Sequence, residues 1–471
     1  MIKTHPAADF PPSEPGGEPV ILDRSHHPIS RRDIDPDALK VLYRLHRHGF
    51  LAYLVGGAVR DLLLRKTPYD FDIGTDARPN QIKRLFRNAF LIGRRFRLAH
   101  IHFQGGKVIE VSTFRSDPEL EPETESPAVG ETGPESVPAA PPVLSREEGE
   151  SAAEAPADRE PGAGRRRPPG HPIAYGTPRE DAFRRDITIN ALFYDIATFN
   201  VIDYVGGLED IAARRIRVIG DPVARYTEDP VRIWRVLRHA ARLDFSLEAE
   251  TGRAIEPCRD LLRTASGARL YEELNKDLKW GAARPLLEMM RAHALLPILF
   301  GLAGRAYQES AGMFGRLGAL LDILDHAVAA GDELSSTEIY SLFYWPWLEP
   351  RLAAAEGDRF KAIHEVVESA SMAVLVPAAV RANVVQTLLI VDHMLQALET
   401  GRMRWSLRKR VHYREASRVL SLILRATPGR EPDPFERLFV QKFPGPAAAP
   451  GRRRRPRRRR DRHRNAGPRP L

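Results

Sequence analysis

The chain has 471 residues, of which 43% are hydrophobic, and a formal net charge of +9 at pH 7. This length allows two or three domains, each with its own core. The single cysteine, Cys258, excludes an intramolecular disulfide and a zinc site built from several cysteines, and it is typical of a reducing compartment. No apolar run reaches the length of a membrane span, and the N-terminus lacks an apolar signal core. We therefore expect a cytoplasmic protein without a membrane segment.

The charge is unevenly distributed along the chain. Residues 1–25 are rich in proline and glycine, and residues 117–170 are acidic and free of aromatic side chains, so we expect both to be disordered. Whether the acidic insert shields a basic cleft or is inert stays open. Residues 444–471 carry 11 arginines, including Arg452 and Arg457, against one aspartate. This tail is typical of salt-dependent, sequence-independent RNA binding; the alternative is docking to an acidic protein partner, such as one involved in RNA decay.

A glycine pair joins the first clear strand to the first catalytic candidate. Phe50–Val55 predicts a buried strand, and Ala58–Leu64 predicts a helix. Between them, Gly56 and Gly57 let the backbone turn and approach a ligand closely. N–H groups at the helix start and the charge of Arg60 favour phosphate. A Gly-Gly pair alone is commonly just a turn, so its meaning depends on the residues after the helix.

Two aspartates come next, in an alternating segment. In Asp70-Phe71-Asp72-Ile73, the apolar residues are predicted to face a core and the two carboxylates the other side, with Cα atoms about 6.6 Å apart. Carboxylates at this spacing can hold a pair of divalent ions for phosphoryl transfer, and oxygen ligands favour Mg²⁺ or Mn²⁺ over zinc. An Asp-x-Asp pair alone is commonly a solvated strand end. The order of strand, Gly-Gly, helix and Asp-x-Asp favours a nucleotide site.

A third carboxylate candidate is Glu110, inside the β-branched strand predicted at Lys107–Thr113. A buried carboxylate needs a cationic partner, and a metal ion would be one. Glu110 is therefore either a third metal ligand or an exposed strand glutamate, and spacing leaves both open. From Asp221 onward, strand signals weaken and helical periodicity dominates.

The motifs of this chain resemble those of the class II nucleotidyltransferases, the family of bacterial poly(A) polymerases and CCA-adding tRNA nucleotidyltransferases. The matching segments are Leu54–Asp61, Asp70–Ala77, Arg184–Leu192, Asp203–Asp210 and Glu228–Arg232. The resemblance implies an α+β N-terminal nucleotidyltransferase domain of the polymerase-beta-like kind, followed by an all-α neck and body. We accordingly expect a catalytic domain at 26–220, a helical neck for base and RNA recognition at 221–300, and a helical RNA-binding body at 301–443.

The resemblance also implies roles for single residues, with ATP as the substrate. Asp70 and Asp72 would bind the catalytic Mg²⁺ ions, Glu110 would be the third carboxylate, and Asp186 would lie at the ribose hydroxyl and complete the active site. Arginine pairs suit forked phosphate contacts, and an Asp–Arg pair can imitate a base-pairing edge. The expected nucleotide-binding residues are Gly56, Gly57, Arg60, Arg184 and Arg185 for the triphosphate, Asp186 for the ribose, Asp229 and Arg232 for the base, and Arg235 and Arg238, whose alternative is a solvated helix face.

Two segments are similar to the poly(A) polymerase branch of the family. They are Ser30–Ile34 with the subsequent Ala38–His46, and Leu91–Ile101, whose Arg94, Arg95 and Arg97 form a basic cluster suited to RNA. The resemblance therefore implies template-independent addition of AMP from ATP to RNA 3′ ends. CCA addition to tRNA is the alternative, because both reactions share the catalytic parts. A catalytically idle RNA-binding protein is the third hypothesis, and the intact aspartates and arginine pair argue against it.

Overall fold

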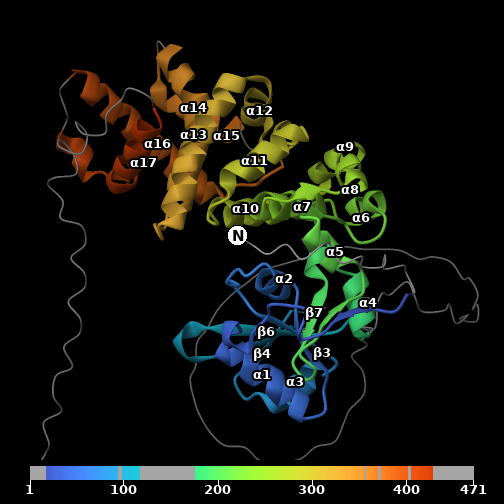
Figure 1. The fold of residues 1–471 in the computed structure, drawn as a ribbon. Coiled ribbons are helices and arrows are strands. Elements are labelled where there is room, and N and C mark those ends of the chain that lie inside the picture. The colour runs from blue at the N-terminus through green and yellow to red at the C-terminus, as the bar shows by residue number, and fades with distance from the viewer. Residues whose placement is uncertain are drawn as a thin grey trace, which may run out of the picture. The chain divides into compact units, whose positions relative to one another are not determined.

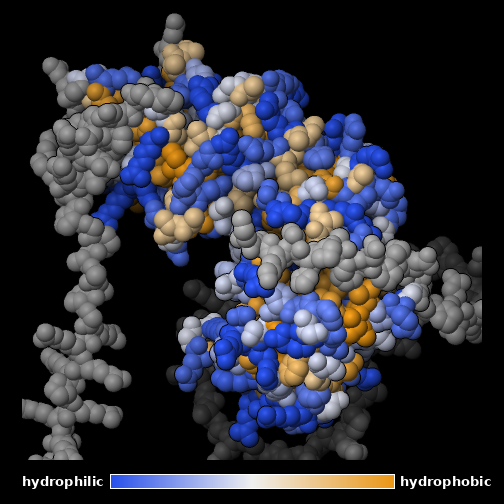
Figure 2. All heavy atoms as spheres, viewed as in Figure 1, coloured by the Kyte–Doolittle hydropathy of each residue, from blue (hydrophilic) through white to orange (hydrophobic). Residues whose placement is uncertain are grey.

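The computed structural model describes residues 17–93, 98–116, 175–354, 357–369, 373–400 and 405–427. The chain forms two compact units, Met1–Gly220 and Asp221–Leu471 (Figure 1). The first unit is built around a β-sheet and the second from helices, which confirms the predicted fold class. Hydrophilic side chains cover much of the visible surface of each unit (Figure 2). The predicted acidic insert at 117–170, the tail at 444–471, and Arg94, Arg95, Arg97, Arg452 and Arg457 lie outside the described residues.

Within its described residues, the first unit contains an eight-stranded sheet in the order β1-β8-β7-β2-β3-β6-β5-β4. β3 and β6 are parallel neighbours, and the other neighbouring strands are antiparallel. The strands are β1 (Val20–Leu22), β2 (Ala52–Val55), β3 (Asp72–Thr75), β4 (Ala89–Ile92), β5 (Leu98–His102), β6 (Val108–Thr113), β7 (Leu192–Asp195) and β8 (Val201–Asp203).

The two faces of this sheet carry different side chains. Across β7, β2 and β3, one row consists of Tyr194, Leu54 and Ile73, and the next row consists of Phe193, Val55 and Asp72. Because side chains alternate along a strand, these rows point to opposite faces. Tyr194, Leu54 and Ile73 belong to the core that includes α1, whereas Phe193 and Val55 belong to a second core. Asp72 therefore lies on the second face.

The helices of the first unit have clear sequence signals. α1 begins where Asp35 accepts hydrogen bonds from the backbone N–H groups of Asp37 and Ala38, at 2.8 and 3.3 Å. Its buried residues, Ala38, Val41, Leu42 and Leu45, recur every three or four positions and face the sheet. The remaining elements are α1 (Pro36–Arg47), α2 (Gly57–Leu63), α3 (Pro79–Leu85), α4 (Pro178–Phe183), α5 (Gly207–Ala212), β9 (Arg215–Ile216) and the short 3₁₀ turns η1 (Arg31–Asp33), η2 (Gln104–Gly106) and η4 (Thr188–Asn190).

The two points where the chain enters and leaves residues 117–174 lie together. Arg115 and Tyr175 form an isolated antiparallel bridge, and the Gly176 N–H donates to the Phe114 carbonyl at 2.9 Å. A Cβ on Gly176 would lie 2.4 Å from the carbonyl carbon of Arg115, so this close approach requires glycine. The entry and the exit are thus fixed beside the end of β6.

The predicted strands before Gly56 and around Glu110 and the helix after Gly57 are confirmed as β2, β6 and α2, with ends shifted by one or two residues. Two details were wrong. Asp70 precedes β3, so only Asp72 is on the strand. Val20–Leu22, inside the tail predicted to be disordered, forms the edge strand β1 by pairing with β8. Edge pairing uses backbone groups, which the composition of a segment does not reveal.

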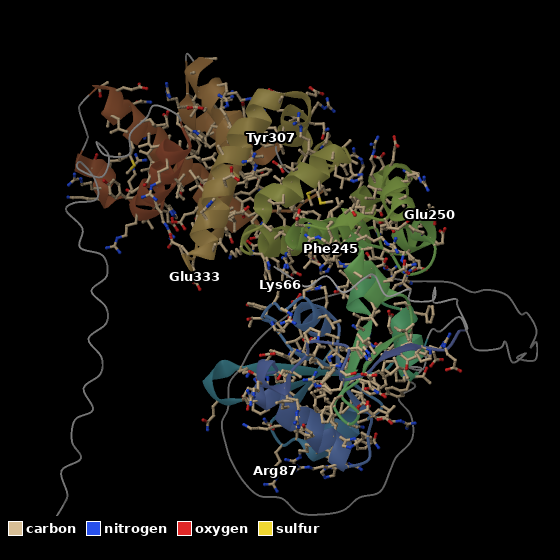
Figure 3. The ribbon with its side chains drawn as sticks, in the orientation of Figure 1. Lys66, Arg87, Phe245, Glu250, Tyr307 and Glu333 are labelled. Carbon is tan, nitrogen blue, oxygen red and sulfur yellow. The ribbon has the colours of Figure 1, made fainter. Side chains whose placement is uncertain are left out.

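The second unit is helical, with one short strand, among the described residues. Tyr307 lies in its interior (Figure 3), where the hydroxyl donates to the Phe343 carbonyl at 2.5 Å. The elements are α6 (Pro222–Glu228), α7 (Val231–Leu243), β10 (Ser246–Leu247), α8 (Ala249–Arg253), α9 (Ile255–Cys258), η5 (Arg259–Thr264), α10 (Gly267–Leu278), α11 (Ala283–Ala292), α12 (Leu296–Glu309), α13 (Ala311–Ala329), α14 (Ser336–Ala354), α15 (Arg359–Ser369), α16 (Ala378–Thr400), η6 (Trp405–Lys409) and α17 (Tyr413–Ala426).

No single helix in the described part of the chain is both long and apolar enough to cross a membrane. Among the described helices, only α11 and α12 taken together reach this length and apolarity, and the two are bent by 97°.

Candidate active site

The glycine turn brings the backbone next to an arginine of the second motif. Gly56, with φ of +74°, lies between β2 and α2, in a conformation that favours glycine. Its N–H donates to the Leu192 carbonyl at 3.2 Å, and a Cβ at this position would lie 3.2 Å from Nη1 of Arg185. Two motifs that are far apart in the sequence therefore meet at this turn.

The aspartates beside this turn have perturbed pKa values. Burial, and then the charges of Asp70 and Glu110, raise the pKa of the half-buried Asp72 to about 7, against the charge of Arg185. Partial desolvation and the charge of Glu110 also raise the pKa of Asp70. The three predicted carboxylates therefore lie within electrostatic reach of one another.

Glu110 has a histidine partner. His100 and Glu110 are directly opposite residues of β5 and β6, and the ring Nε2 lies 2.7 Å from the carboxylate Oε1. Among the residues that the structure describes, no three His, Cys, Asp or Glu side chains are placed so that they could hold a metal ion. The carboxylates fit a divalent cation by their chemistry, because they offer only oxygen atoms and repel one another. The metal-binding role of Glu110 stays a proposal.

Arg60 connects the helix after the glycine turn to the second motif. Its Nη1 donates to Asn190 Oδ1 at 2.5 Å, and its Nε donates to Asp61 Oδ1 at 2.9 Å. The residue is only 9% exposed. Arg60 therefore fixes α2 against η4, and its predicted phosphate contact stays a prediction.

The second motif forms a cluster of guanidinium groups. Arg185 donates to Asp181 through Nε and Nη2, at 3.1 and 3.0 Å, and Arg184 donates to the Ser116 carbonyl. Burial, and then the charges of Arg184 and Arg185, lower the pKa of the half-buried Arg115. The cluster thus concentrates positive charge next to the glycine turn, as a triphosphate site needs.

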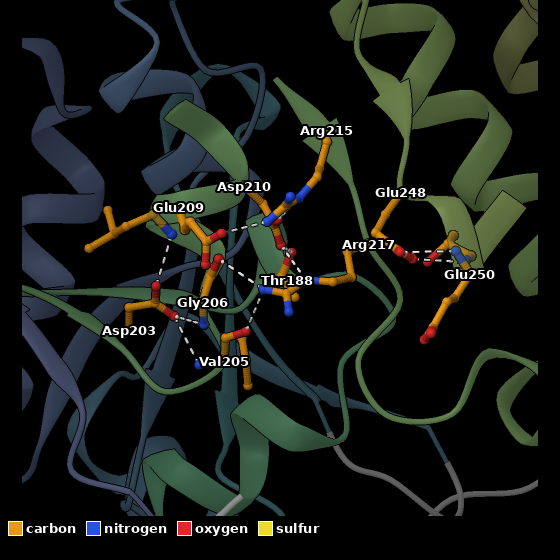
Figure 4. A network of polar contacts seen from close by, with 12 residues as sticks. Thr188, Asp203, Val205, Gly206, Glu209, Asp210, Arg215, Arg217, Glu248 and Glu250 are labelled. Atoms are coloured by element: carbon orange, nitrogen blue, oxygen red, sulfur yellow. Dashed lines mark hydrogen bonds and ion pairs between the residues drawn. The ribbon is translucent and has the colours of Figure 1, made fainter. Parts of the chain in front are cut away.

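Two buried aspartates organise the segment from Asp203 to Asp210, and one of them also binds the second motif (Figure 4). Asp203 accepts hydrogen bonds of 2.8–3.0 Å from the backbone N–H groups of Val205, Gly206 and Leu208. Asp210 is fully buried and accepts from Thr188 Oγ1, Arg215 Nε and Arg217 Nε at 2.5–2.7 Å. Asp210 therefore ties the second motif, through Thr188, to Arg215 and Arg217, and the half-buried Asp186 precedes Thr188 by two residues.

In the second unit, the predicted base-recognition residues lie at the start of α7. Asp229 accepts two hydrogen bonds from Arg269, at 2.9 and 2.8 Å, and one from Arg235 at 3.0 Å. Burial alone would raise the pKa of Asp229, but the hydrogen bonds from Arg269 and the charges of Arg235 and Arg269 outweigh burial and lower the pKa. Arg232 donates to Glu228 Oε2 at 2.5 Å. The structure thus brings Asp229, Arg232 and Arg235 together and adds Arg269.

Arg238, also predicted to bind the nucleotide, has a guanidinium that is buried and paired with carboxylates. It is 8% exposed, and it donates to Asp277 at 2.6 and 2.9 Å and to Glu273. Asp277 also accepts from Trp234 Nε1 at 2.7 Å. A buried guanidinium bound to two carboxylates stabilises the packing of α7 against α10. Arg238 therefore has a packing role in this structure, and its predicted nucleotide contact stays a prediction.

Comparison with known proteins decides the family. A family model described as the poly(A) polymerase head domain matches residues 52–217, and one described as the probable RNA and SrmB-binding site of polymerase A matches residues 244–302. The chain is 35% identical to poly(A) polymerase I of Salmonella typhimurium over 418 residues, which cover 86% of this chain and 81% of that one. The chain belongs to the poly(A) polymerase family.

More distant similarity extends to the CCA-adding enzymes. The one from Bacillus pumilus is 34% identical over 274 residues, which cover 58% of this poly(A) polymerase family member and 57% of that enzyme. The solved structure of the Bacillus stearothermophilus CCA-adding enzyme in complex with CTP has a TM-score of 0.59 at 23% identity, covering 87% of this chain and 83% of that chain. This likeness shows a shared fold.

Proposed function

We propose that this chain extends RNA 3′ ends with AMP taken from ATP, without a template. The observation that carries the proposal is the setting of Asp72. Burial and two neighbouring carboxylates raise its pKa, and the positive charge of Arg185 at the glycine turn acts in the opposite direction. Negative groups for cations and positive groups for phosphate therefore lie side by side, as in-line phosphoryl transfer requires. The similarity to poly(A) polymerase I supports RNA and ATP as the substrates.

Each residue would have a distinct task. Asp70 and Asp72, with Glu110, would hold Mg²⁺ or Mn²⁺, which when bound lowers the pKa of the attacking 3′ hydroxyl and neutralises charge on the leaving pyrophosphate. Arg185 would make forked contacts to the triphosphate beside Gly56, with Arg184 adding positive charge. Asp186 would accept a hydrogen bond from the ribose hydroxyl. Holding both reactants in line removes most of the entropic cost of bringing them together.

Base choice would fall to the start of α7. Asp229 presents carboxylate oxygens, and Arg232 presents N–H groups, so together they offer the acceptors and donors of a base-pairing edge. Arg235 and Arg269 hold the Asp229 carboxylate ionised and oriented.

A nucleotide-incorporation assay tests the proposal. The purified chain is incubated with Mg²⁺, labelled ATP or CTP, and either a generic RNA or a tRNA that lacks its CCA end. We expect long A tails on generic RNA, no extension by Asp72→Asn, and full extension by Asp33→Asn, which alters an exposed carboxylate of the same unit. CTP-dependent growth of the tRNA that stops after the CCA end would instead support the alternative, which the likeness to CCA-adding enzymes keeps in view.

The reaction also fits a location and a set of partners. ATP and RNA 3′ ends meet in the cytoplasm, and a chain with one cysteine is compatible with its reducing conditions. We propose that residues 444–471 add sequence-independent affinity for RNA, because each arginine–phosphate contact releases counterions. Docking of the same residues to an acidic protein of RNA decay is the second possibility.

A further inference from the structure

A hollow of about 410 Å³ lies on the first unit, away from the residues of the proposed reaction. The described residues contribute no carboxylate to its lining. It combines three arginines with three aromatic rings: Arg24, Arg31, Arg32, Tyr43, Tyr194 and Phe199. Arg31 and Arg32 belong to the segment from Ser30 to Ile34, to which the proposed reaction assigns no task.

This hollow is on the opposite face of the sheet from Asp72. Tyr194 shares its row across the sheet with Leu54 and Ile73, whereas Asp72 shares the next row with Val55. Side chains of adjacent rows point to opposite faces. A ligand in the hollow would therefore be separated from the catalytic carboxylates by the sheet itself.

The arginines of the hollow have no acidic partners within the described residues. Arg24 Nη1 donates to the His27 carbonyl at 3.2 Å, and Arg31 Nη1 donates to the Tyr43 hydroxyl at 3.0 Å. The Arg31 guanidinium also lies 4.8 Å from the centre of the Phe199 ring. By contrast, Arg185 of the same unit is bound to a carboxylate. The hollow thus holds positive charge that the described part of the protein does not neutralise.

A second hollow of about 590 Å³ continues the first along α1 and shares Leu39 and Tyr43 with it. It adds Arg44 and Arg47, for which the described residues again provide no carboxylate partner, and the Phe86 ring, 5.3 Å from the Arg44 guanidinium. Positive charge therefore runs along one side of α1 beside the partly exposed rings of Tyr43 and Phe199, whereas the Tyr194 and Phe86 rings are buried, at 1% and 6% exposure, and form the floor. A groove of this composition is typical of surfaces that bind single-stranded nucleic acid, with phosphates on the cations and bases on the rings.

We propose that these two hollows form a track for single-stranded RNA on the α1 face of the sheet. A free mononucleotide would fill only one hollow, whereas a chain would use both, which is why the continuity through Tyr43 favours RNA. The track does not depend on the proposed reaction, because an RNA-binding protein without polymerase activity would use the same residues.

Fluorescence anisotropy with the full chain and a short unstructured RNA tests the track. The double variant Arg31→Gln/Arg44→Gln removes one charge from each hollow. We expect RNA affinity to fall about tenfold at low salt, and the slope of log K against log salt to decrease by about 1.4, since each single-strand phosphate contact contributes about 0.7. Arg84→Gln, an exposed arginine of α3 that lines neither hollow, is the matched control and should leave both quantities unchanged.

The same measurements in an Asp72→Asn background separate the track from the polymerase reaction. The double variant should weaken RNA binding equally there, whether or not the chain extends RNA. An unchanged affinity and salt slope in the double variant would overturn the track. Displacement of the RNA by 5′-AMP at comparable concentration would also overturn it, in favour of a mononucleotide site. Melting temperatures equal to that of the parent chain verify that the variants are folded.

Discussion

A side chain at Gly56 would begin 3.2 Å from Nη1 of Arg185, so the glycine turn and the arginine of the second motif occupy adjoining space. If both hold the triphosphate, the absence of a Cβ is what lets phosphate oxygens reach the backbone and the guanidinium together.

Gly56→Ala should therefore raise KM for ATP about tenfold or more, because the new methyl group crowds Arg185 and because φ of +74° with ψ of −136° is a backbone conformation that essentially only glycine adopts. Steady-state incorporation kinetics measure this. Gly49→Ala is the matched control: Gly49 has φ of +81° and no atom within 4 Å of its Cβ position. It introduces a side chain at a positive φ without crowding any neighbour, so equal KM values for the two variants would contradict the proposed contact.

Asp72 should make the chain less stable as pH rises in the absence of metal. Its folded pKa of about 7 exceeds the ordinary value of 3.8, so the folded state holds the proton more tightly than the unfolded chain. The resulting stability is complete below about pH 4 and is lost as pH rises through 7. In EDTA, Asp72→Asn should therefore melt a few degrees above the parent at pH 8 and at nearly the same temperature at pH 4. Mg²⁺ should raise the melting temperature of the parent more than that of the variant.

His100 tests the role of Glu110. If Glu110 binds metal, Glu110→Gln should raise the Mg²⁺ concentration needed for half-maximal incorporation by about tenfold or more, the usual cost of losing a metal-site contact. His100→Gln, which keeps a donor opposite Glu110, should have a much smaller effect. A Mg²⁺ titration that is the same for Glu110→Gln and the parent would assign Glu110 to strand pairing alone.

Asp210 should be the more important of two aspartates for stability. It is fully buried and accepts from Thr188, Arg215 and Arg217, so Asp210→Ala removes their shared acceptor and should cost about 1–3 kcal/mol, because Arg215 keeps Glu209 and Arg217 keeps backbone carbonyls as partners. Asp33→Ala removes an exposed carboxylate of the same unit and should change stability by less than about 0.5 kcal/mol. Urea unfolding monitored by far-UV circular dichroism compares the two variants. A small loss for Asp210→Ala would show that the network relaxes around the gap.

Arg269 should influence base choice through Asp229. Arg269→Ala removes two of the hydrogen bonds that orient the carboxylate, so the ratio of AMP to CMP incorporation should fall several-fold while incorporation itself persists. Arg263→Ala, an exposed arginine that pairs only with Asp260 at 3.3 Å within the described residues, is the control. An unchanged ratio in the Arg269 variant would separate Asp229 from base reading.

The hydrophobic pattern of the sequence correctly predicted the elements whose formation depends on neighbouring residues. The strand before Gly56, the helix after it and the apolar role of Ile73 derive from hydrophobic periodicity, and all are confirmed. Pattern could not reveal long-range partners. Asp277, the carboxylate that Arg238 binds, lies on α10, and His100, which faces Glu110, lies on the neighbouring strand β5. Arg115, Arg269 and His100 were missed for the same reason, since no local spacing links them to their partners.

The bridge between Arg115 and Tyr175 joins the two ends of the stretch that separates them, directly after β6. Because its two ends are already joined, lengthening or shortening it changes closure entropy only slowly, and the sheet experiences little of that change. The site is therefore a natural place to shorten the polypeptide with a brief linker, to insert a reporter domain, or to open new termini by circular permutation.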